Sequence, residues 1–158
     1  MVTHVYGLTE SYGPAVICEW KEKWQKIESS QKKAQLKSRQ GVKYPSLEFL
    51  EVMDTKNMKP VNKDGKMIGE VMFRGNIVMK GYLNNNEANA EAFKKEWFHT
   101  GDLAVVHSDG YIELKDRAKD IIISGGENIS SIEIEKTIMQ LKSVSDCAVI
   151  GIKNEKWG

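Results

Sequence analysis

The chain has 158 residues, which is enough for one ordinary domain or for two small domains joined by a hinge. Apolar residues make up 41% and charged residues 28% of the sequence, a balance that is typical of folded globular proteins and excludes a disordered tail. The 23 basic and 22 acidic side chains leave a formal charge of +1, so there is no overall basic field to attract nucleic acid or an anionic membrane.

Neither a membrane span nor a disulfide framework is indicated. No apolar run approaches the ~18 residues of a membrane span. The amino-terminal residues also lack the basic start and apolar core of a secretory signal. Cys18 and Cys147 stand far apart and in no metal-binding motif. We therefore expect both to be reduced packing residues in a reducing compartment.

The first part of the chain predicts a strand followed by a helical segment. Val2–Tyr6 is a β-rich run that ends at a glycine turn, which is typical of a short buried strand. In the lysine-rich stretch Glu19–Gln40, three large apolar residues, Trp20, Trp24 and Ile27, recur at helical spacing and share one face. We expect this face to pack on the protein body with the lysines in solvent. A partner-binding aromatic stripe is the alternative.

Between Pro45 and Asp116 the pattern changes to short strands separated by turns. Asp-Gly pairs at 64–65 and 109–110 stand between β-rich runs and predict hairpins, because tight primed turns need positive φ. A helix is expected after Asn84–Asn86. The expected strands are Leu47–Met53, Lys66–Arg74, Leu103–His107 and Tyr111–Leu114. The segment is interpreted as a small, mostly antiparallel sheet or barrel.

A third pattern begins near Asp116–Asp120. The apolar run Ile121–Ile123 leads into a Gly-Gly turn, after which Ser130 and Glu133 form a capping-box pair that predicts a helix start. The buried face of this helix is expected to hold Ile134, Ile138 and Leu141. Cys147–Ile152 is expected to form a further strand. The change of pattern indicates a boundary between two structural units.

Four short clusters hold side chains suited to nucleotide chemistry. Thr9 and Glu10 follow the glycine turn, where a hydroxyl suits a phosphate oxygen and a carboxylate suits a metal that bridges phosphates. Asp102 lies in a turn from which it can accept from two ribose hydroxyls, and the guanidinium of Arg117 can reach ribose or phosphate oxygens. The two glycines of Ser124–Asn128 allow the backbone to approach a ligand closely.

Each cluster taken alone also fits a purely structural role. Polar residues commonly end strands, Asp commonly follows Gly in turns, and a Gly-Gly pair is usually a simple turn. Arg117 also fits a surface ion pair with Asp116 or Asp120.

Taken together and in this order, the clusters resemble the adenylate-forming, AMP-binding superfamily of acyl-CoA synthetases, coumarate-CoA-type ligases and luciferases. The matching blocks are YGLTE at 6–10, GEVMFRGNIVMKGYLNN at 69–85, WFHTGD at 97–102 and DRAKDIIISGGENISSIEIE at 116–135. The resemblance extends over essentially all 158 residues. The polar stretch after YGLTE is most similar to plant acyl-activating enzymes of the benzoate and short-chain acyl-CoA ligase type.

The resemblance implies a role for each matching residue. It implies that a bound nucleotide contacts Tyr6, Gly7, Thr9, Asp102, Leu114 and Arg117. It places magnesium at Glu10 and the hinge between two domains at Lys119. It also implies that the path of coenzyme A is lined by Ser124, Gly125, Gly126 and Glu127.

The chemistry implied by the resemblance has two steps and uses ATP, Mg²⁺ and coenzyme A. A carboxylic acid substrate first attacks the α-phosphorus of ATP and forms acyl-AMP and pyrophosphate. The thiol of coenzyme A then displaces AMP after a small lid domain has rotated. No nucleic-acid partner and no membrane span are expected, and the implied location is cytoplasmic or peroxisomal.

The implied fold is α/β: the end of a parallel-sheet domain plus a small antiparallel β-barrel subdomain, a hinge, and then part of an α+β C-terminal lid. The large-domain portion is expected at 1–118 and the lid portion at 119–158.

Two family motifs are missing from these 158 residues: the Ser/Thr/Gly-rich phosphate loop that ends in Pro-Lys-Gly, and the lid's catalytic lysine in a Gly-Lys motif near the carboxyl end. We therefore expect an expressed fragment, a truncated gene model or a partial duplicate, with no catalytic residue and no activity by itself. The alternative is a non-catalytic module that binds nucleotide, acyl-CoA or a full-length relative.

Overall fold

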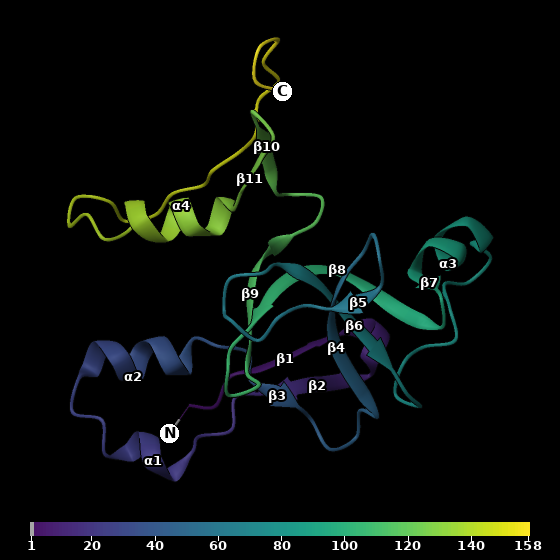
Figure 1. Cartoon of the computed structure of the whole chain (residues 1–158), viewed down its shortest axis with the longest axis horizontal. Coiled ribbons are helices and arrows are strands. Elements are labelled where there is room, and N and C mark those ends of the chain that lie inside the picture. Colours follow the sequence, from purple (N-terminus) through teal and green to yellow (C-terminus); the bar gives the residue numbers. More distant parts are fainter. Residues whose placement is uncertain (1) are drawn as a thin grey trace.

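The computed structural model describes residues 2–158 as an α+β protein with three antiparallel sheets, of which the two larger ones form a half-barrel (Figure 1). The smaller of these two sheets has the order β1 (Val5–Leu8), β2 (Gly13–Ile17), β3 (Val42–Lys43). The larger sheet has the order β5 (Lys59–Pro60), β4 (Phe49–Asp54), β6 (Gly69–Arg74), β8 (Trp97–Val106), β7 (Phe93–Lys94), and β9 (Ile112–Arg117) also pairs with β8. A backbone bridge between Gly41 and Ile112 joins the two sheets.

One apolar core lies between the two sheets. Five of the six residues of β6 are buried, among them Val71 and Phe73, which are fully inaccessible. The ring of Phe73 stacks on Phe98 at 6.5 Å between centroids and contacts Tyr6 of β1 at 6.0 Å. Because each fully buried side chain of this size contributes ~1.5–3 kcal/mol, these contacts fix β1 against β6 and β8.

Two short helices replace the single helical face expected at Glu19–Gln40. Helix α1 spans Glu22–Gln25 and α2 spans Ser30–Lys37. Ser29 is the N-cap of α2, and its side chain accepts a capping hydrogen bond. Ser29 starts a second helix, so the helical segment is divided in two.

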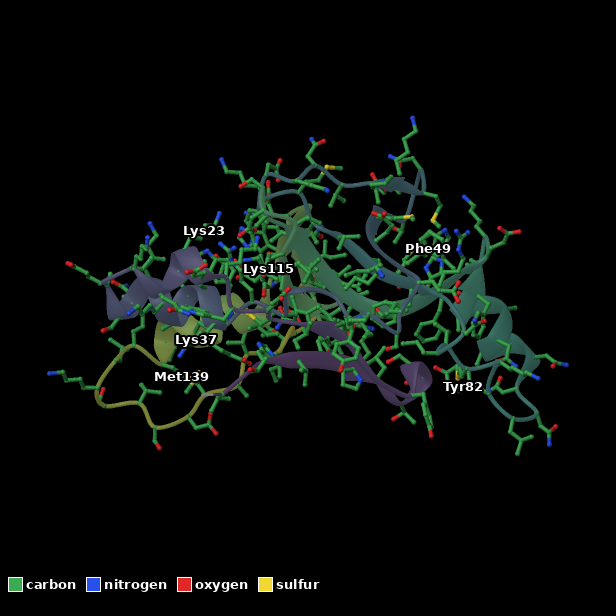
Figure 2. All side chains as sticks on the ribbon, turned by 90° about the horizontal axis from the view of Figure 1, so that it is seen from below. Lys23, Lys37, Phe49, Tyr82, Lys115 and Met139 are labelled. Atoms are coloured by element: carbon green, nitrogen blue, oxygen red, sulfur yellow. The ribbon has the colours of Figure 1, made fainter. Side chains whose placement is uncertain are left out.

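The aromatic residues of this segment pack inward as expected. Trp24 is 5% exposed and meets the ring of Tyr111 at 5.0 Å, and Trp20 and Ile27 pack around the same cluster. Lys23 and Lys37, on α1 and α2, are exposed (Figure 2). The packing interpretation of the stripe is therefore confirmed.

Most predicted strands exist with shifted bounds. The first strand begins at Val5, which is 47% exposed, and its turn continues as the 3-10 helix η1 (Thr9–Ser11). Strand β8 begins at Trp97 instead of 103, because its first half pairs with β6 and β7. The helix expected after Asn84–Asn86 is α3 (Asn86–Ala92). All strand pairs within residues 2–158 are antiparallel, so the parallel sheet stays a prediction.

The last part of the chain forms a separate hairpin and a helix. Strands β10 (Ile122–Ser124) and β11 (Glu127–Ile129) pair with each other, and α4 spans Ser131–Ile138. Ser130 caps α4 as expected. Cys147–Ile152 is not a strand: it has no ladder partner within residues 2–158, so that expectation is wrong. Leu141 is 58% exposed and lies beyond the end of α4, so it does not belong to a buried face.

The start of α4 is anchored on β9 by a buried carboxylate. Asp116 is 5% exposed and accepts hydrogen bonds from the backbone N–H and the hydroxyl of Ser131, at 2.7 and 2.9 Å. The hydroxyl of Ser130 donates to the carbonyl of Lys115 at 2.7 Å. These bonds satisfy donors at a helix start and favour a negative charge there.

Both cysteines are free, with Cys18 buried and Cys147 half-buried, as expected. No helix within residues 2–158 has the length and apolar character needed to cross a bilayer.

Candidate functional site: a polar pocket at the η1 turn

An open pocket of about 710 Å³ lies between the η1 turn, the middle of β8 and the end of β9. Its lining comes from four segments that are far apart in the sequence. The lining residues are Gly7, Leu8, Thr9, Glu10, Tyr82, Phe98, His99, Thr100, Gly101, Asp102, Arg117, Ala118 and Lys119. Six residues singled out in the sequence therefore meet in one place: Gly7, Thr9, Glu10, Asp102, Arg117 and Lys119.

Asp102 is held between two partners. It lies directly across the β8–β9 ladder from Arg117, whose Nε is 3.6 Å from Oδ1. On the other side, the hydroxyl of Tyr6 donates a 2.6 Å hydrogen bond to Oδ2. Asp102 is only 8% exposed, whereas the Arg117 side chain is 59% exposed. The ion pair is therefore largely hydrated, and the tyrosine supplies the shorter contact.

The Tyr6 hydroxyl remains a donor at ordinary pH. Burial raises the pKa of Tyr6 above its ordinary value, and the hydrogen bond to Asp102 raises it further. Tyr6 lies in the core beneath the pocket rather than among its lining residues. Its direct contact with a nucleotide stays a prediction, and the observed role is to hold one oxygen of Asp102.

The pocket wall contains a β-bulge at Thr100–Asp102. Glu70 pairs with Leu103 and Met72 with His99, so one residue of β6 faces three residues of β8. Gly101 has φ +74°, a conformation that glycine adopts without a steric cost. The extra residues turn the strand locally and bring Asp102 to the pocket.

Glu10, the predicted metal residue, is connected to the segment before α3. Its carboxylate Oε1 accepts a hydrogen bond from the hydroxyl of Tyr82 at 3.0 Å, and its carbonyl accepts from the N–H of Met79 at 2.7 Å. The side-chain amide of Asn89 accepts a hydrogen bond from the Tyr82 N–H at 2.6 Å and donates one to the Tyr82 carbonyl at 3.0 Å. In Figure 2, Tyr82 lies beside the η1 turn.

The carboxylate of Glu10 fits magnesium as a single protein ligand. No group of three His, Cys, Asp or Glu side chains within residues 2–158 forms a metal cage. Magnesium usually binds one or two carboxylates and completes its octahedron with substrate phosphates and water. Glu10 is half-buried at the pocket wall and has the chemistry for this role.

The remaining predicted residues do not line this pocket. Leu114 lies on β9, where its side chain packs against the core and its N–H donates to the Gln40 side chain at 2.6 Å. Ser124, Gly125, Gly126 and Glu127 form the turn region of the β10–β11 hairpin. Their predicted contact with coenzyme A stays a prediction.

Three residues that line or support the pocket received no individual role from the sequence: Tyr82, His99 and Glu70. Tyr82 and His99 lie inside recognised blocks, but nothing in their spacing indicates a contact with Glu10 or the bulge. Glu70 does not line the pocket; it supports the pocket wall from β6 and is 7% exposed. The sequence signal for Glu70 is an acidic residue within an otherwise apolar strand, a position where acidic residues are rarely buried without a partner.

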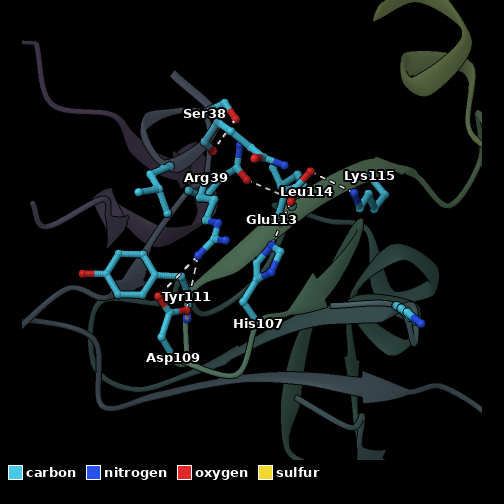
Figure 3. A network of polar contacts seen from close by, with 12 residues as sticks. Ser38, Arg39, His107, Asp109, Tyr111, Glu113, Leu114 and Lys115 are labelled. Atoms are coloured by element: carbon cyan, nitrogen blue, oxygen red, sulfur yellow. Dashed lines mark hydrogen bonds and ion pairs between the residues drawn. The ribbon is translucent and has the colours of Figure 1, made fainter. Parts of the chain in front are cut away.

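A second polar network lies at the far end of the β8–β9 hairpin (Figure 3). Glu113 accepts from His107 and Lys115, each at 2.8 Å. Burial favours the neutral acid, but these two partners outweigh it and hold the pKa of Glu113 below its ordinary value. Nearby, Arg39 meets both carboxylate oxygens of Asp109 at 3.3 Å. None of these residues lines the pocket at the η1 turn.

Comparison with known proteins assigns the family. The family model described as AMP-binding enzyme matches residues 1–83, more than half of the 158 residues. The chain therefore belongs to the AMP-binding enzyme family.

Curated relatives are similar over nearly the whole chain. It is 57% identical to the acetate–CoA ligase CCL3 of Humulus lupulus over 157 residues, covering 99% of this chain and 28% of that protein. It is 53% identical to the peroxisomal acetate/butyrate–CoA ligase AAE7 of Arabidopsis thaliana, covering 99% of this chain and 27% of that protein. The chain thus spans slightly more than a quarter of the length of these relatives.

Solved structures share the fold. The o-succinylbenzoate CoA synthetase of Bacillus subtilis, in complex with its acyl-adenylate intermediate, superposes with a TM-score of 0.79 at 30% identity, covering 99% of this chain and 29% of that chain. The same enzyme in complex with ATP and magnesium gives a TM-score of 0.77 at 28% identity, covering 98% and 30%. The half-barrel and its hairpin therefore resemble part of an adenylate-forming ligase.

Proposed function

We propose that this chain carries the ribose- and phosphate-binding face of an ATP-dependent acyl-CoA ligase. The single observation that supports it most strongly is that the η1 turn brings Thr9 and Glu10 to the same pocket as Asp102 and Arg117. Such a ligase joins a carboxylic acid to coenzyme A by way of acyl-AMP.

In this proposal each pocket residue has one chemical task. Asp102 accepts hydrogen bonds from the ribose hydroxyls, and charge-assisted bonds of this kind are roughly twice as strong as neutral ones. Arg117 reaches the same ribose with its exposed guanidinium. Thr9 donates its hydroxyl to the adenylate phosphate, and Gly7 allows the backbone to approach the nucleotide. Glu10 would hold magnesium, which neutralises charge on the phosphates.

We also propose that 1–118 and 119–158 are parts of two domains that move about Lys119. The β8–β9 ladder ends at Arg117, and the next strand pair is the separate β10–β11 hairpin, which supports a pivot between them. The Ser124–Glu127 turn would line the coenzyme A path in one orientation of the lid. The contacts of Asp116 with Ser131 would then belong to one of the two lid positions.

The location and partners follow the same proposal. Several relatives are named as peroxisomal, which supports a cytoplasmic or peroxisomal location. The partners would be a carboxylic acid and coenzyme A, and association with a full-length relative stays a prediction.

Titration of the ¹⁵N-labelled chain with AMP, followed by NMR, tests the proposal. We expect shifts of backbone amide signals at Gly7, Thr9, Gly101 and Asp102, with none at the Asp109 turn, which lies outside the pocket. Pyrophosphate provides the second arm, since it lacks a ribose and should shift Thr9 and Glu10 but not Asp102. Saturating AMP without shifts at the pocket would contradict the proposal.

A further inference from the structure

The direction of Asp102 depends on a bulge that the sheet ladder does not stabilise by itself. Across the bulge, Val71 of β6 faces Thr100–Asp102 of β8, so the regular exchange of backbone hydrogen bonds is interrupted there. Backbone groups that lose ladder partners must be satisfied in another way, because an unpaired buried N–H destabilises the fold.

Two side chains supply the missing partners. The Glu70 carboxylate accepts the N–H of Gly101 through Oε1 at 2.9 Å. The Thr100 hydroxyl donates to the carbonyl of Val71 at 2.7 Å and accepts the N–H of Asp102 at 3.1 Å. The backbone of Asp102 is therefore fixed by Thr100, and its neighbour Gly101 is fixed by Glu70.

Glu70 is itself oriented by His99. Its second oxygen, Oε2, lies 2.8 Å from Nδ1 of His99, and the residue is 7% exposed. Burying a carboxylate is costly unless it is paired and hydrogen-bonded. An apolar side chain would fill this position in β6 at a lower cost, so the carboxylate indicates a specific need for an acceptor.

The His99 ring faces Glu70 with Nδ1, the nitrogen that makes the 2.8 Å contact. Its other nitrogen, Nε2, is buried and has no partner within residues 2–158. The proton of a neutral ring therefore belongs on Nδ1, where it is donated to Glu70. Both oxygens of Glu70 are then engaged, which holds the carboxylate toward Gly101.

We propose that Glu70 and His99 are a positioning pair that fixes the Thr100–Asp102 bulge and so determines how Asp102 meets the ribose of a nucleotide. This inference rests on the proposed function, because it assigns the pair a role at the same pocket. Neither residue needs to touch the ribose, since both act through the backbone of the bulge.

The test is isothermal titration of the full 158-residue chain with AMP, using three variants. Glu70→Ala should weaken AMP binding at least about tenfold, because a charge-assisted hydrogen bond to the bulge is lost. Glu70→Gln keeps an acceptor of the same shape, so it should weaken binding only about two- to fivefold. Glu113→Ala is the matched control: it breaks a similar His–Glu pair that lies between β8 and β9 outside the pocket, and should leave AMP affinity unchanged.

A structural role would give a different pattern. Glu70→Ala and Glu113→Ala would then both lower the melting temperature while AMP affinity stayed at the wild-type value, and this result would overturn the positioning role. Wild-type protein that binds no AMP would overturn the proposed function as well. Wild-type binding with unchanged affinity in both Glu70 variants overturns the positioning role alone.

A spectroscopic measurement covers the case in which Glu70→Ala does not fold. The Gly101 amide proton of the wild-type chain donates to a carboxylate, so its NMR signal should move upfield in Glu70→Gln. The Asp102 amide should move with it, while the amide of Tyr111 at the far end of the hairpin should not. An unchanged Gly101 signal in Glu70→Gln would overturn the proposal without any measurement of binding.

Discussion

The hydroxyl of Tyr6 donates a 2.6 Å hydrogen bond to Oδ2 of Asp102 and so joins the first strand of the chain to the centre of β8. The two residues are 96 positions apart in the sequence. The other oxygen, Oδ1, is contacted only at the longer distance of 3.6 Å, by Nε of Arg117. Oδ1 is therefore the less firmly held oxygen of Asp102. A ribose must share or displace one of these two partners.

Tyr6→Phe tests this relationship. The variant keeps the buried ring but leaves a nearly buried carboxylate oxygen without its donor, so the free energy of unfolding should fall by about 1–3 kcal/mol. Urea unfolding followed by tryptophan fluorescence measures the change. Tyr12→Phe is the control, since Tyr12 is 92% exposed and should change stability by less than about 0.5 kcal/mol. Equal stabilities of the two variants would show that the hydroxyl contact contributes nothing.

Arg117→Ala and Asp102→Ala should be coupled. Asp102 and Arg117 are cross-strand neighbours and, in the proposed function, share the ribose as a partner. The loss of AMP affinity in the double variant should therefore be smaller than the sum of the two single losses, as expected for residues in contact. Additive losses would indicate that the two side chains act on different parts of the nucleotide.

The Glu113 network should make stability depend on pH in a defined window. Its pKa in the folded chain is below the ordinary value of 4.5, so its contribution is fully present above pH 4.5 and is lost as the pH falls through the lower folded pKa. Glu113→Gln should therefore destabilise the chain at pH 7, and by progressively less as the pH falls below 4.5. Urea unfolding over a pH series checks this, and a pH-independent difference would exclude the ion pairs as its cause.

The isolated chain should show no acid-dependent exchange between ATP and pyrophosphate. Without the phosphate loop and the lid lysine, charge in the transition state has too few fixed donors, and losing even one such donor costs about 10²–10³ in rate. Incubation with labelled pyrophosphate and a panel of short-chain acids measures the exchange. Activity of the pure chain would require another phosphate clamp within the same 158 residues.

Local features were predicted well from the sequence. The Asp-Gly pair at 109–110 lies in the turn between β8 and β9, and Ser130 caps α4. Both signals depend only on nearby backbone geometry, which the sequence contains. The meeting of Thr9 and Glu10 with Asp102 and Arg117 was expected only through the family resemblance. Spacing alone does not show which strand ends share a pocket.

Features that depend on tertiary partners were not predicted. Cys147–Ile152 has the composition of a strand but finds no ladder partner in the part of the chain that the structure describes, and a strand exists only where another strand pairs with it. The bulge at Gly101 and its acceptor Glu70 lie on different strands, so no local pattern connects them. Tyr6 was expected against a nucleotide, and only the structure shows its hydroxyl on Asp102.

The most direct measurement is calorimetric titration of AMP into the wild-type chain, Asp102→Ala and the control Asp109→Asn, whose carboxylate pairs with Arg39 outside the pocket. We expect Asp102→Ala to weaken AMP binding by about 1.5–3 kcal/mol, or one to two decades in Kd, because a charge-assisted acceptor is lost. Asp109→Asn should bind AMP like wild type. A folded Asp102→Ala chain with unchanged AMP affinity would show that Asp102 does not bind the nucleotide.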